Sequence, residues 1–484
     1  MMRRIRFWAI TGLCVLASAV AGSEVRAQGA RPAQAAGFSG RWEGAIDVLG
    51  TKLGITVTAT GTGAALTATI DIPQQSAMGL QLTNVRYEPP RVHFELVAPP
   101  GLAVFDGELR DGLIKGTFEQ GAVKGTFELA PPGAPKPAAP SELPPPYKQE
   151  EVKIQSGTIT LAGTLTLPDS RPPFPAVVLI SGSGPQNRDE EVFGMKPFGL
   201  IADALTRRGI AVLRCDDRGV GGSTGNTPQS SSADFADDAL AEVQYLKGRP
   251  EIDKARIGLL GHSEGGLVAP IAASRSSDVA FIVLLSGPAV TGEKTLYAQS
   301  ELAIRAAGGT EETVRKNTDI LKLIFAAVRT GTGWDRVAEV VTAEMKAALD
   351  AAPAAQQLPP DKRDAVIKAQ VTAQIANSRT PWFKFFLDYD PAPTLQKVKC
   401  PVLAVFGERD LQVPVALNRE PMEQALKSGG NTAYTIEVMA RANHLYQEAK
   451  TGAVQEYTML KKEFVPELLP LLTSWILKQG PARK

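Results

Sequence analysis

The run Ile257-Gly258-Leu259-Leu260 leads directly into Gly261-His262-Ser263-Glu264-Gly265, and an apolar stretch with helical spacing follows. This succession predicts a buried strand, a sharp turn and a helix, an arrangement that exposes a nucleophilic serine at a sheet edge. The two glycines allow the strand and helix to approach closely while the serine takes a strained backbone conformation. Because the five-residue pattern also arises by chance, its structural setting carries most of the weight. Pro270 conflicts with the expected helix, since a proline inside a helix costs about 3 kcal/mol.

Strand and helix patterns alternate around this turn. We expect strands at residues 151–155, 158–167, 176–180, 210–214, 256–260, 280–285, 402–406 and 434–438, and helices at 197–208, 234–247, 265–274, 415–427 and 454–477. Such alternation predicts an α/β fold, in which residues 150–480 form a mostly parallel sheet with helices on both faces.

Residues 289–395 interrupt this alternation. Helical periodicity occupies residues 296–307, 311–328, 334–349 and 361–376, with no convincing parallel strand between them. An insertion between strands of one sheet is expected to form a helical lid over the carboxyl edge, where ligands bind in such folds. Its aromatic residues include Trp382 and Phe386, which we interpret either as part of an acyl pocket or as a structural seam.

A small all-β domain is expected at residues 37–130. Short alternating runs, such as residues 53–58 and 92–96, are broken by Gly, Asn and Pro. They predict an antiparallel meander that closes into a small barrel or forms a sandwich to hide its edges. His93 lies in such a run without an acidic or cysteine partner at ligand spacing, so a structural role is expected and no metal site. The proline-rich residues 131–149 predict a stiff linker.

The first residues indicate export. Arg3, Arg4 and Arg6 precede an apolar run at residues 7–21, and Val25-Arg26-Ala27 offers a cleavage site before Gln28. Residues 1–27 are therefore interpreted as a cleaved signal peptide, with a periplasmic or secreted product. A membrane anchor is the alternative, but it needs about 20 apolar residues. Cys14 lacks the preceding small residues of a lipoprotein site, so no stable membrane anchor is expected.

Charge and cysteine content exclude other classes of protein. The 52 basic and 51 acidic residues nearly cancel and form no long run of one sign, so nucleic acid is not an expected partner. After cleavage, only Cys215 and Cys400 remain, too few for a disulfide-built scaffold. They lie at opposite ends of their predicted parallel strands, beyond disulfide reach, so both are expected to be free structural thiols.

A serine hydroxyl needs a base, and histidine is best suited to that role near neutral pH. Of the three histidines, His93 belongs to the other domain and His262 points away if Ser263 points into the site, which leaves His444. Glu408 and Asp410 both follow the preceding strand, and either could hold the imidazole. We select Asp410 because it lies further into the loop toward His444.

The oxyanion of an acyl-transfer reaction requires donors that are already in place. The backbone N–H of Glu264 is expected to be one. The second is expected from the loop Ser181-Gly182-Ser183-Gly184-Pro185, at the N–H of Ser183, although this stretch also fits an ordinary Gly-Ser turn.

These motifs together resemble the bacterial serine esterases of the α/β-hydrolase superfamily that carry an N-terminal β-domain. The resemblance extends from about Phe38 onward and rests on four stretches. They are residues 181–185 with Arg188-Asp189-Glu190, residues 217–223 (DRGVGGS), residues 261–265 and Asn443-His444-Leu445. Many relatives begin the oxyanion loop with histidine, where Ser181 stands here. The resemblance implies that Asp217 and Arg218 form a structural loop stabilised by a salt bridge.

The sequence therefore predicts a hydrolase that cleaves carboxylic esters of small or medium acyl length through an acyl-enzyme, without a cofactor or metal. The partner is then a small-molecule ester, and the oligomeric state is left open. A peptidase or amidase is the alternative, because the same triad cleaves amides. A binding module for wall polymer or glycan, led by the β-domain, is a third possibility without an evident aromatic platform to support it.

Overall fold

The computed structural model describes residues 37–48, 51–72, 77–98, 101–120, 123–132, 145–350 and 360–480. Two compact units are present. Described residues within 145–329 and 380–480 form one, here called the α/β unit, and those within 37–132 and 330–379 form the other, the β-rich unit. The predicted signal peptide and most of the predicted linker lie outside the described residues. Lys148 and Gln149, assigned to that linker, instead begin a strand, so the linker prediction was too long.

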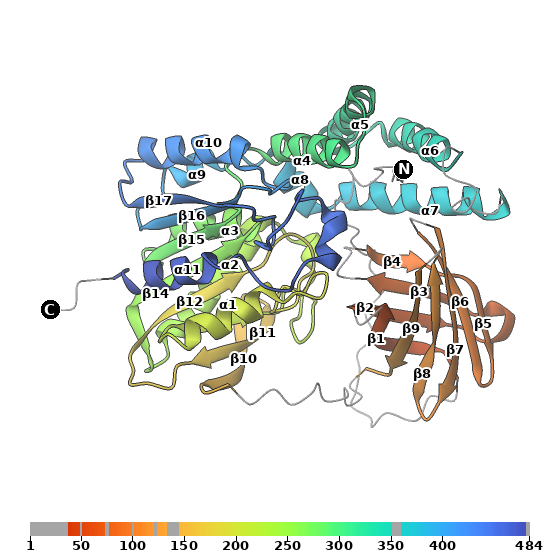
Figure 1. Ribbon diagram of the computed structural model, residues 1–484, viewed down its shortest axis with the longest axis horizontal. Helices are drawn as coiled ribbons and strands as arrows, with labels where there is room; N and C mark the ends of the chain where they lie inside the picture. The colour runs from red at the N-terminus through yellow and green to blue at the C-terminus, as the bar shows by residue number, and fades with distance from the viewer. Residues whose placement is uncertain are drawn as a thin grey trace, which may run out of the picture. The chain divides into compact units, whose positions relative to one another are not determined.

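The β-rich unit contains one antiparallel sheet of nine strands, in the order β4-β3-β2-β1-β9-β8-β7-β6-β5 (Figure 1). Its apolar side chains alternate along the strands and meet in a single core, in which the rings of Phe94, Phe105 and Phe127 are in contact. A single sheet with one core excludes the two-sheet sandwich. Within the described residues β4 and β5 end the strand order without pairing with each other, so the predicted barrel is not closed. The strands are β1 Gly40–Val48, β2 Thr51–Thr60, β3 Thr67–Ile72, β4 Ala77–Gln81, β5 Thr83–Glu88, β6 Arg91–Ala98, β7 Gly101–Arg110, β8 Leu113–Gln120 and β9 Val123–Ala130.

The α/β unit is built on an eight-stranded sheet with the order β10-β11-β13-β12-β14-β15-β16-β17. β11 is antiparallel to both of its neighbours, and all other pairs are parallel, as the alternating pattern predicted. The strands are β10 Lys148–Ser156, β11 Ile159–Leu167, β12 Phe174–Ile180, β13 Ala211–Cys215, β14 Ile252–His262, β15 Phe281–Leu285, β16 Val402–Gly407 and β17 Tyr434–Met439.

Helices cover both faces of this sheet (Figure 1). α1 (Pro197–Thr206) and α11 (Leu468–Leu477) share one apolar core with the sheet. The opposite core contains α2 (Ser232–Lys247), α3 (Gly265–Arg275) and α10 (Val415–Ser428). α3 runs through Pro270, which deprives the Gly266 carbonyl of its usual donor without ending the helix.

The helix predicted at residues 454–477 was wrong. The structure has a short 3-10 helix, Val454–Met459, and then an irregular segment before α11. Pro466 disfavours helical geometry at Val465, whose N–H instead donates to the carbonyl of Tyr446 at 2.8 Å. This bond attaches the segment to the loop that carries His444.

The inserted helices divide between the two units. α4 (Gly292–Ala306), α5 (Glu311–Thr330), α8 (Pro381–Asp388) and α9 (Ala392–Leu395) lie essentially within the α/β unit. By contrast, α6 (Trp334–Asp350) and α7 (Pro360–Ser378) belong to the β-rich unit. α8 and α9 were not predicted as helices.

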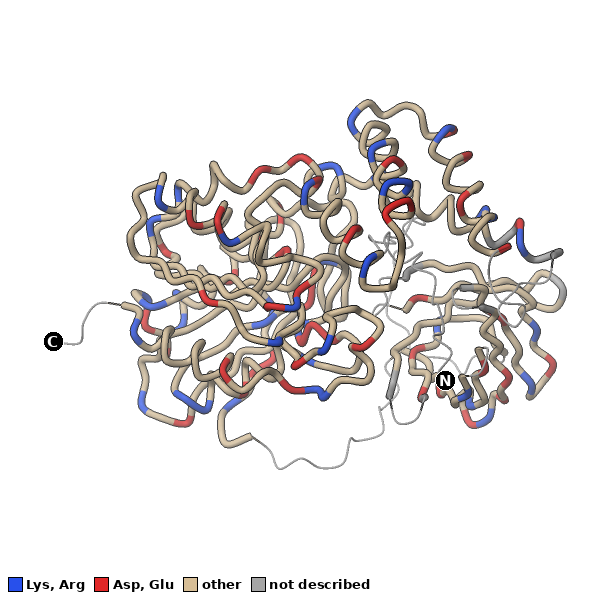
Figure 2. Tube along the Cα trace, turned by 45° about the horizontal axis from the view of Figure 1, so that its top comes forward, with Lys and Arg blue, Asp and Glu red and all other residues tan. Residues whose placement is uncertain are grey.

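Cys215 and Cys400 are free thiols. Cys215 ends β13, whereas Cys400 precedes β16, so they lie at opposite ends of parallel strands, as predicted. No helix in the described ranges is long and apolar enough to cross a membrane. Basic and acidic residues are interspersed along both units (Figure 2).

Candidate active site

Ser263 occupies the sharp turn between β14 and α3. Its backbone has φ of 53°, in the left-handed region that side chains rarely adopt, and its N–H donates to the carbonyl of Leu285 at 2.8 Å. A Cβ on Gly261 would lie 1.9 Å from the Gly265 carbonyl oxygen, and one on Gly265 would lie 2.1 Å from that of Ile180. Only glycine fits at either position, so the sequence motif holds the serine in a strained conformation.

Asp410 and His444 meet at the same edge of the sheet. Asp410 follows β16 and His444 follows β17, and because these strands are parallel their loops emerge together. Nδ1 of His444 lies 2.8 Å from Oδ2 of Asp410, and both side chains are almost completely buried. This contact orients the ring so that Nε2 faces away from the carboxylate.

The Asp410 carboxylate is held by several donors. Oδ1 accepts the backbone N–H groups of Gln412 at 2.8 Å and Val413 at 2.9 Å. Burial alone would raise the pKa of Asp410, but the positive charge and hydrogen bond of His444, with the backbone donors and Ser286, lower it below its ordinary value. Asp410 is therefore ionised at neutral pH.

Glu408, the other carboxylate considered from the sequence, faces elsewhere. Its Oε2 accepts the backbone N–H of Arg441 at 2.7 Å. Arg409 donates to the carbonyls of Ala449 and Lys450 rather than to Glu408. The structure thus brings Asp410, and not Glu408, to the imidazole.

The loop that carries His444 is fixed by its neighbour Asn443. The Asn443 side chain is fully buried, and its Oδ1 accepts the N–H groups of Leu445 at 3.0 Å and Gln447 at 2.9 Å. Gly407 allows this loop to approach β16, because a Cβ there would lie 2.6 Å from the Ala442 carbonyl oxygen. The main chain at His444 is therefore rigidly positioned.

His262 brings the serine turn and the histidine loop together. Its ring centroid lies 4.7 Å from that of His444, and its Nε2 lies 2.9 Å from the His444 carbonyl oxygen. In the part of the chain described, no hydrogen bond joins Ser263 Oγ to the His444 imidazole. Such bonds are often long in unliganded sites and shorten when substrate binds.

The oxyanion loop follows β12. The N–H of Gly182 donates to Oε1 of Glu190 at 2.7 Å and is therefore occupied. The N–H groups of Ser183 and Glu264 donate to no other group within the described residues. A Cβ on Gly182 would lie 3.2 Å from the Cβ of Ser263, so this loop runs directly beside the serine.

Asp217 and Arg218 have separate structural roles. Asp217 accepts the hydroxyl of Ser181 at 2.6 Å and the N–H of Gln186 at 2.8 Å, which braces the oxyanion loop. Arg218 pairs with Asp238, with Nε 2.6 Å from Oδ2. The salt bridge implied by the resemblance is present at Arg218, while Asp217 acts through hydrogen bonds to a different loop.

The aromatic residues of α8 reach the serine turn. Nε1 of Trp382 donates to Oε1 of Glu264 at 2.7 Å, and Ser232 donates to the same oxygen at 2.6 Å. Trp382 stacks on Phe386 with a centroid separation of 5.1 Å, and both side chains are buried. Burial raises the pKa of Glu264 to about 7 despite the two hydrogen bonds. Trp382 therefore contacts the residue that follows the serine.

Glu190 is the main residue of the site that sequence reasoning missed. Its carboxylate contacts both Gly182 and His262, whose Nδ1 lies 2.9 Å from Oε1. Glu190 and His262 are 72 positions apart, and only folding brings them together. The stretch Arg188-Asp189-Glu190 is part of the family resemblance, but that resemblance did not predict a role for Glu190.

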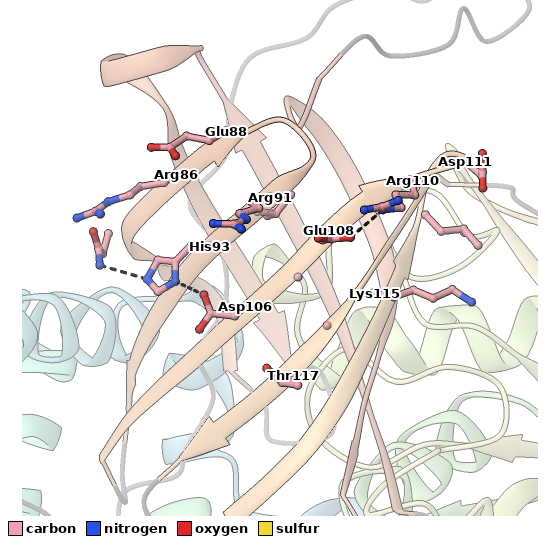
Figure 3. A pocket seen from close by; sticks show the side chains of 15 residues that line it. Arg86, Glu88, Arg91, His93, Asp106, Glu108, Arg110, Asp111, Lys115 and Thr117 are labelled. Atoms are coloured by element: carbon pink, nitrogen blue, oxygen red, sulfur yellow. Dashed lines mark hydrogen bonds and ion pairs between the residues drawn. The ribbon is translucent and has the colours of Figure 1, made fainter.

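A second polar cluster lies on the outer face of the β-rich unit (Figure 3). Asp106 Oδ1 lies 2.6 Å from Nδ1 of His93, and Asn84 Nδ2 lies 3.2 Å from Nε2. His93 therefore has the acidic partner that sequence spacing did not show, supplied by the adjacent strand. These side chains line an open hollow of about 920 Å³. A cross-strand row of alternating charge runs beside them, through Glu88, Arg91, Glu108, Lys115 and Glu128.

The described residues contain no group of three or more His, Cys, Asp or Glu side chains that could hold a metal ion. At the edge of the sheet where the serine turn lies, the structure places a hydroxyl, an imidazole, a carboxylate and backbone donors.

Several known proteins are similar to this chain. Esterase EstD of Thermotoga maritima is 26% identical over 339 residues, which cover 70% of each chain. An uncharacterised 31.7 kDa protein of Escherichia coli is 24% identical over 57% of this chain and 84% of its own. Among solved structures, an esterase of Pyrococcus furiosus is similar over 71% of this chain and 97% of its own, with 16% identity and a TM-score of 0.42.

The family model described as serine aminopeptidase, S33, matches residues 195–447, slightly more than half of the chain. The matched region includes Ser263, Asp410 and His444, and its sheet has the mostly parallel order described above. The chain therefore belongs to the serine aminopeptidase S33 family of α/β-hydrolases.

Proposed function

We propose that this protein is an exported serine hydrolase that cleaves carboxylic esters through an acyl-enzyme intermediate. Ser263 is the nucleophile, His444 the general base and Asp410 the carboxylate that orients it. The observation that carries the proposal is the buried 2.8 Å contact between His444 Nδ1 and Asp410 Oδ2, at the sheet edge where the strained turn of Ser263 lies.

The first half-reaction forms the acyl-enzyme. Ser263 Oγ attacks the ester carbonyl while Nε2 of His444 takes its proton, and Asp410 stabilises the resulting imidazolium. The N–H groups of Glu264 and Ser183 are free to donate to the oxyanion, and losing one such donor typically costs about 2.7–4 kcal/mol of transition-state stabilisation. When the tetrahedral intermediate collapses, His444 gives its proton to the leaving alcohol.

The second half-reaction releases the acid. A water molecule enters the place of the alcohol, His444 removes one of its protons, and the resulting hydroxide attacks the acyl carbonyl. Collapse of this intermediate returns the proton to Ser263 and frees the carboxylic acid. Both halves use the same base and the same donors, so one site suffices.

Ester substrates are supported by the relative from Thermotoga maritima that is named an esterase. On the acyl side, the stacked pair Trp382 and Phe386 supplies an apolar surface beside Glu264 and favours small or medium acyl chains. Export is supported by the charged and apolar pattern of residues 1–27.

An amidase or peptidase is the second candidate, because the matching family is described as serine aminopeptidases. The triad chemistry is common to both reactions, and an amide additionally needs its leaving amine to be protonated. The two candidates therefore differ in substrate preference rather than in the catalytic residues.

A substrate panel separates them. Purified protein is assayed with nitrophenyl esters of increasing acyl length and with aminoacyl and peptidyl anilides, and Ser263→Ala is the control for unrelated hydrolysis. The ester proposal predicts a higher kcat/KM for the esters by several powers of ten. Faster turnover of the anilides would replace it with the peptidase.

A further inference from the structure

Glu190 and His262 form a buried ion pair next to the turn that carries Ser263. Their side chains are 4% and 7% exposed, and Nδ1 of His262 lies 2.9 Å from Oε1 of Glu190. Neither residue is part of the triad. The proposed mechanism uses nearby backbone N–H groups, and neither of these two side chains takes part in it.

The partners of His262 define its protonation state. Nε2 faces the carbonyl oxygen of His444 at 2.9 Å, and a carbonyl oxygen can only accept, so Nε2 carries a proton. Nδ1 faces Oε1 of Glu190, which already accepts the Gly182 N–H at 2.7 Å and so acts as an acceptor. A ring with acceptors at both nitrogens is satisfied when it is an imidazolium paired with an ionised carboxylate.

The electrostatic surroundings favour the same state. Burial lowers the pKa of His262, but the charge and hydrogen bond of Glu190, the His444 carbonyl and the charge of Asp410 outweigh it, so the pKa is raised overall. The other groups facing the ring are the imidazole of His444, 4.7 Å away, and Tyr446, 6.4 Å away between centroids.

The pair connects three loops of the site. Oε1 of Glu190 also accepts the Gly182 N–H of the oxyanion loop at 2.7 Å, His262 precedes the nucleophile, and its Nε2 bonds to the main chain of His444. Glu190 is held in the left-handed region, with φ of 51°, and its second oxygen, Oε2, is buried without a hydrogen-bond partner among the described residues. A strained backbone and a buried carboxylate oxygen without a hydrogen bond both cost folding free energy. Packing alone does not explain why they are retained.

We propose that the Glu190–His262 ion pair is a positioning device that aligns the oxyanion loop and the main chain of His444 with Ser263. This alignment requires a charged His262, because a neutral imidazole has only one N–H donor for its two acceptors. This inference rests on the proposed function for its kinetic consequence, but the charge state of His262 is independent of what substrate is cleaved.

The first test is the charge state. In protein labelled with ¹⁵N at histidine, both ring nitrogens of His262 are expected to show protonated chemical shifts at pH 7, with the assignment made by comparison with His262→Gln. Glu190→Gln keeps an oxygen for the Gly182 N–H but removes the charge, so one nitrogen is expected to become unprotonated at pH 7. An unprotonated nitrogen on His262 in the wild-type protein would overturn the proposal, whether or not the protein is an esterase.

The second test is kinetic. His262→Gln is expected to lower kcat on a nitrophenyl acetate by about 10- to 100-fold, the usual cost of a misplacement near 1 Å, with a much smaller change in KM. Glu190→Gln is expected to retain near-normal kcat at pH 6 and to have lost it by pH 7, where the wild type is still fully active. A merely structural pair would lower the melting temperature without moving the pH profile.

His93→Gln provides the matched control. His93 also pairs with a carboxylate, Asp106 at 2.6 Å, but in the β-rich unit. The kcat and pH profile of His93→Gln are expected to match those of the wild type. The positioning role is contradicted if Glu190→Gln, folded by circular dichroism, has the wild-type pH profile.

Discussion

Oδ2 of Asp410 contacts Nδ1 of His444 at 2.8 Å, whereas the neighbouring Glu408 binds a backbone N–H of Arg441. Asp410→Asn would present an amide that does not hold the imidazole in the required tautomer. We therefore expect a loss of about 10⁴-fold in kcat, as in other triads. Glu408→Gln is the matched control and is expected to cost far less. If the order of the two losses reverses while both variants remain folded by circular dichroism, Glu408 is the acid.

Removal of the nucleophile or base is expected to be non-additive. Ser263→Ala should abolish labelling by a fluorophosphonate, and His444→Ala should nearly abolish it because the hydroxyl then stays protonated. Each is expected to reduce turnover by several powers of ten, and the double variant by little more, since triad residues act as a unit. Multiplicative losses in the double variant would show that the two side chains act separately.

The stacked pair on α8 is expected to control acyl length. Trp382→Ala and Phe386→Ala remove apolar surface beside Glu264, so they should shift the preference among longer nitrophenyl esters more than they change hydrolysis of the acetate. Phe385→Ala is the control, because Phe385 stacks instead on Tyr389 with a centroid separation of 5.0 Å. An equal loss at all chain lengths would indicate packing rather than substrate contact.

Glu264 is expected to make stability depend on pH. Burial raises its folded pKa to about 7 from an ordinary value of 4.5, so between these values the unfolded chain releases a proton that the folded chain keeps. Its contribution to stability is thus fully present below pH 4.5 and is lost as pH rises through 7, by about 3 kcal/mol in all.

Glu264→Gln keeps an oxygen for Ser232 and Trp382 but cannot ionise. We expect the variant to lose less stability than the wild type between pH 5 and pH 8, measured as the midpoint of urea unfolding. Glu437→Gln, at an exposed position of β17, should follow the wild type. If the unfolding midpoints of the wild type and Glu264→Gln change with pH in the same way, buried Glu264 is not the source of the pH dependence.

Export is tested by N-terminal sequencing of protein expressed in a bacterial host. Protein recovered from the periplasm or the medium is expected to begin near Gln28, because Ala27 ends the predicted cleavage site. Substituting Ala27 by a bulky residue should impair cleavage. Recovery of an intact Met1 from the cytoplasm would contradict export.

Much of the α/β unit could be predicted because its signals are local. Buried strands such as β15 and β16 are continuous apolar runs, and the order of strands and helices along the chain specifies a parallel sheet. His444 could be selected by elimination because the chain has only three histidines. Asp410 rested on its position in a loop, a weaker argument.

What could not be predicted depends on contacts between distant segments. Glu190 reaches His262 across 72 positions, and Asp217 reaches Ser181 across 36, without any local pattern that marks either pair. The apolar spacing at residues 454–477 resembles a helix, but Pro466 and the bond from Val465 to Tyr446 hold part of it irregular. The inserted helices all have the same helical spacing of apolar residues. That spacing does not show that α6 and α7 belong to a different unit.

The contact between His262 and His444 spans 182 positions of the chain, and Asp410 also lies far beyond the serine. At the usual rate of synthesis, a ribosome adds that length in about 10 to 40 s. Throughout that interval the growing chain contains Ser263 but not His444, the base of the proposed mechanism. On the proposed mechanism, a prematurely terminated product therefore lacks the base that activates Ser263, and full reactivity arises only in finished molecules.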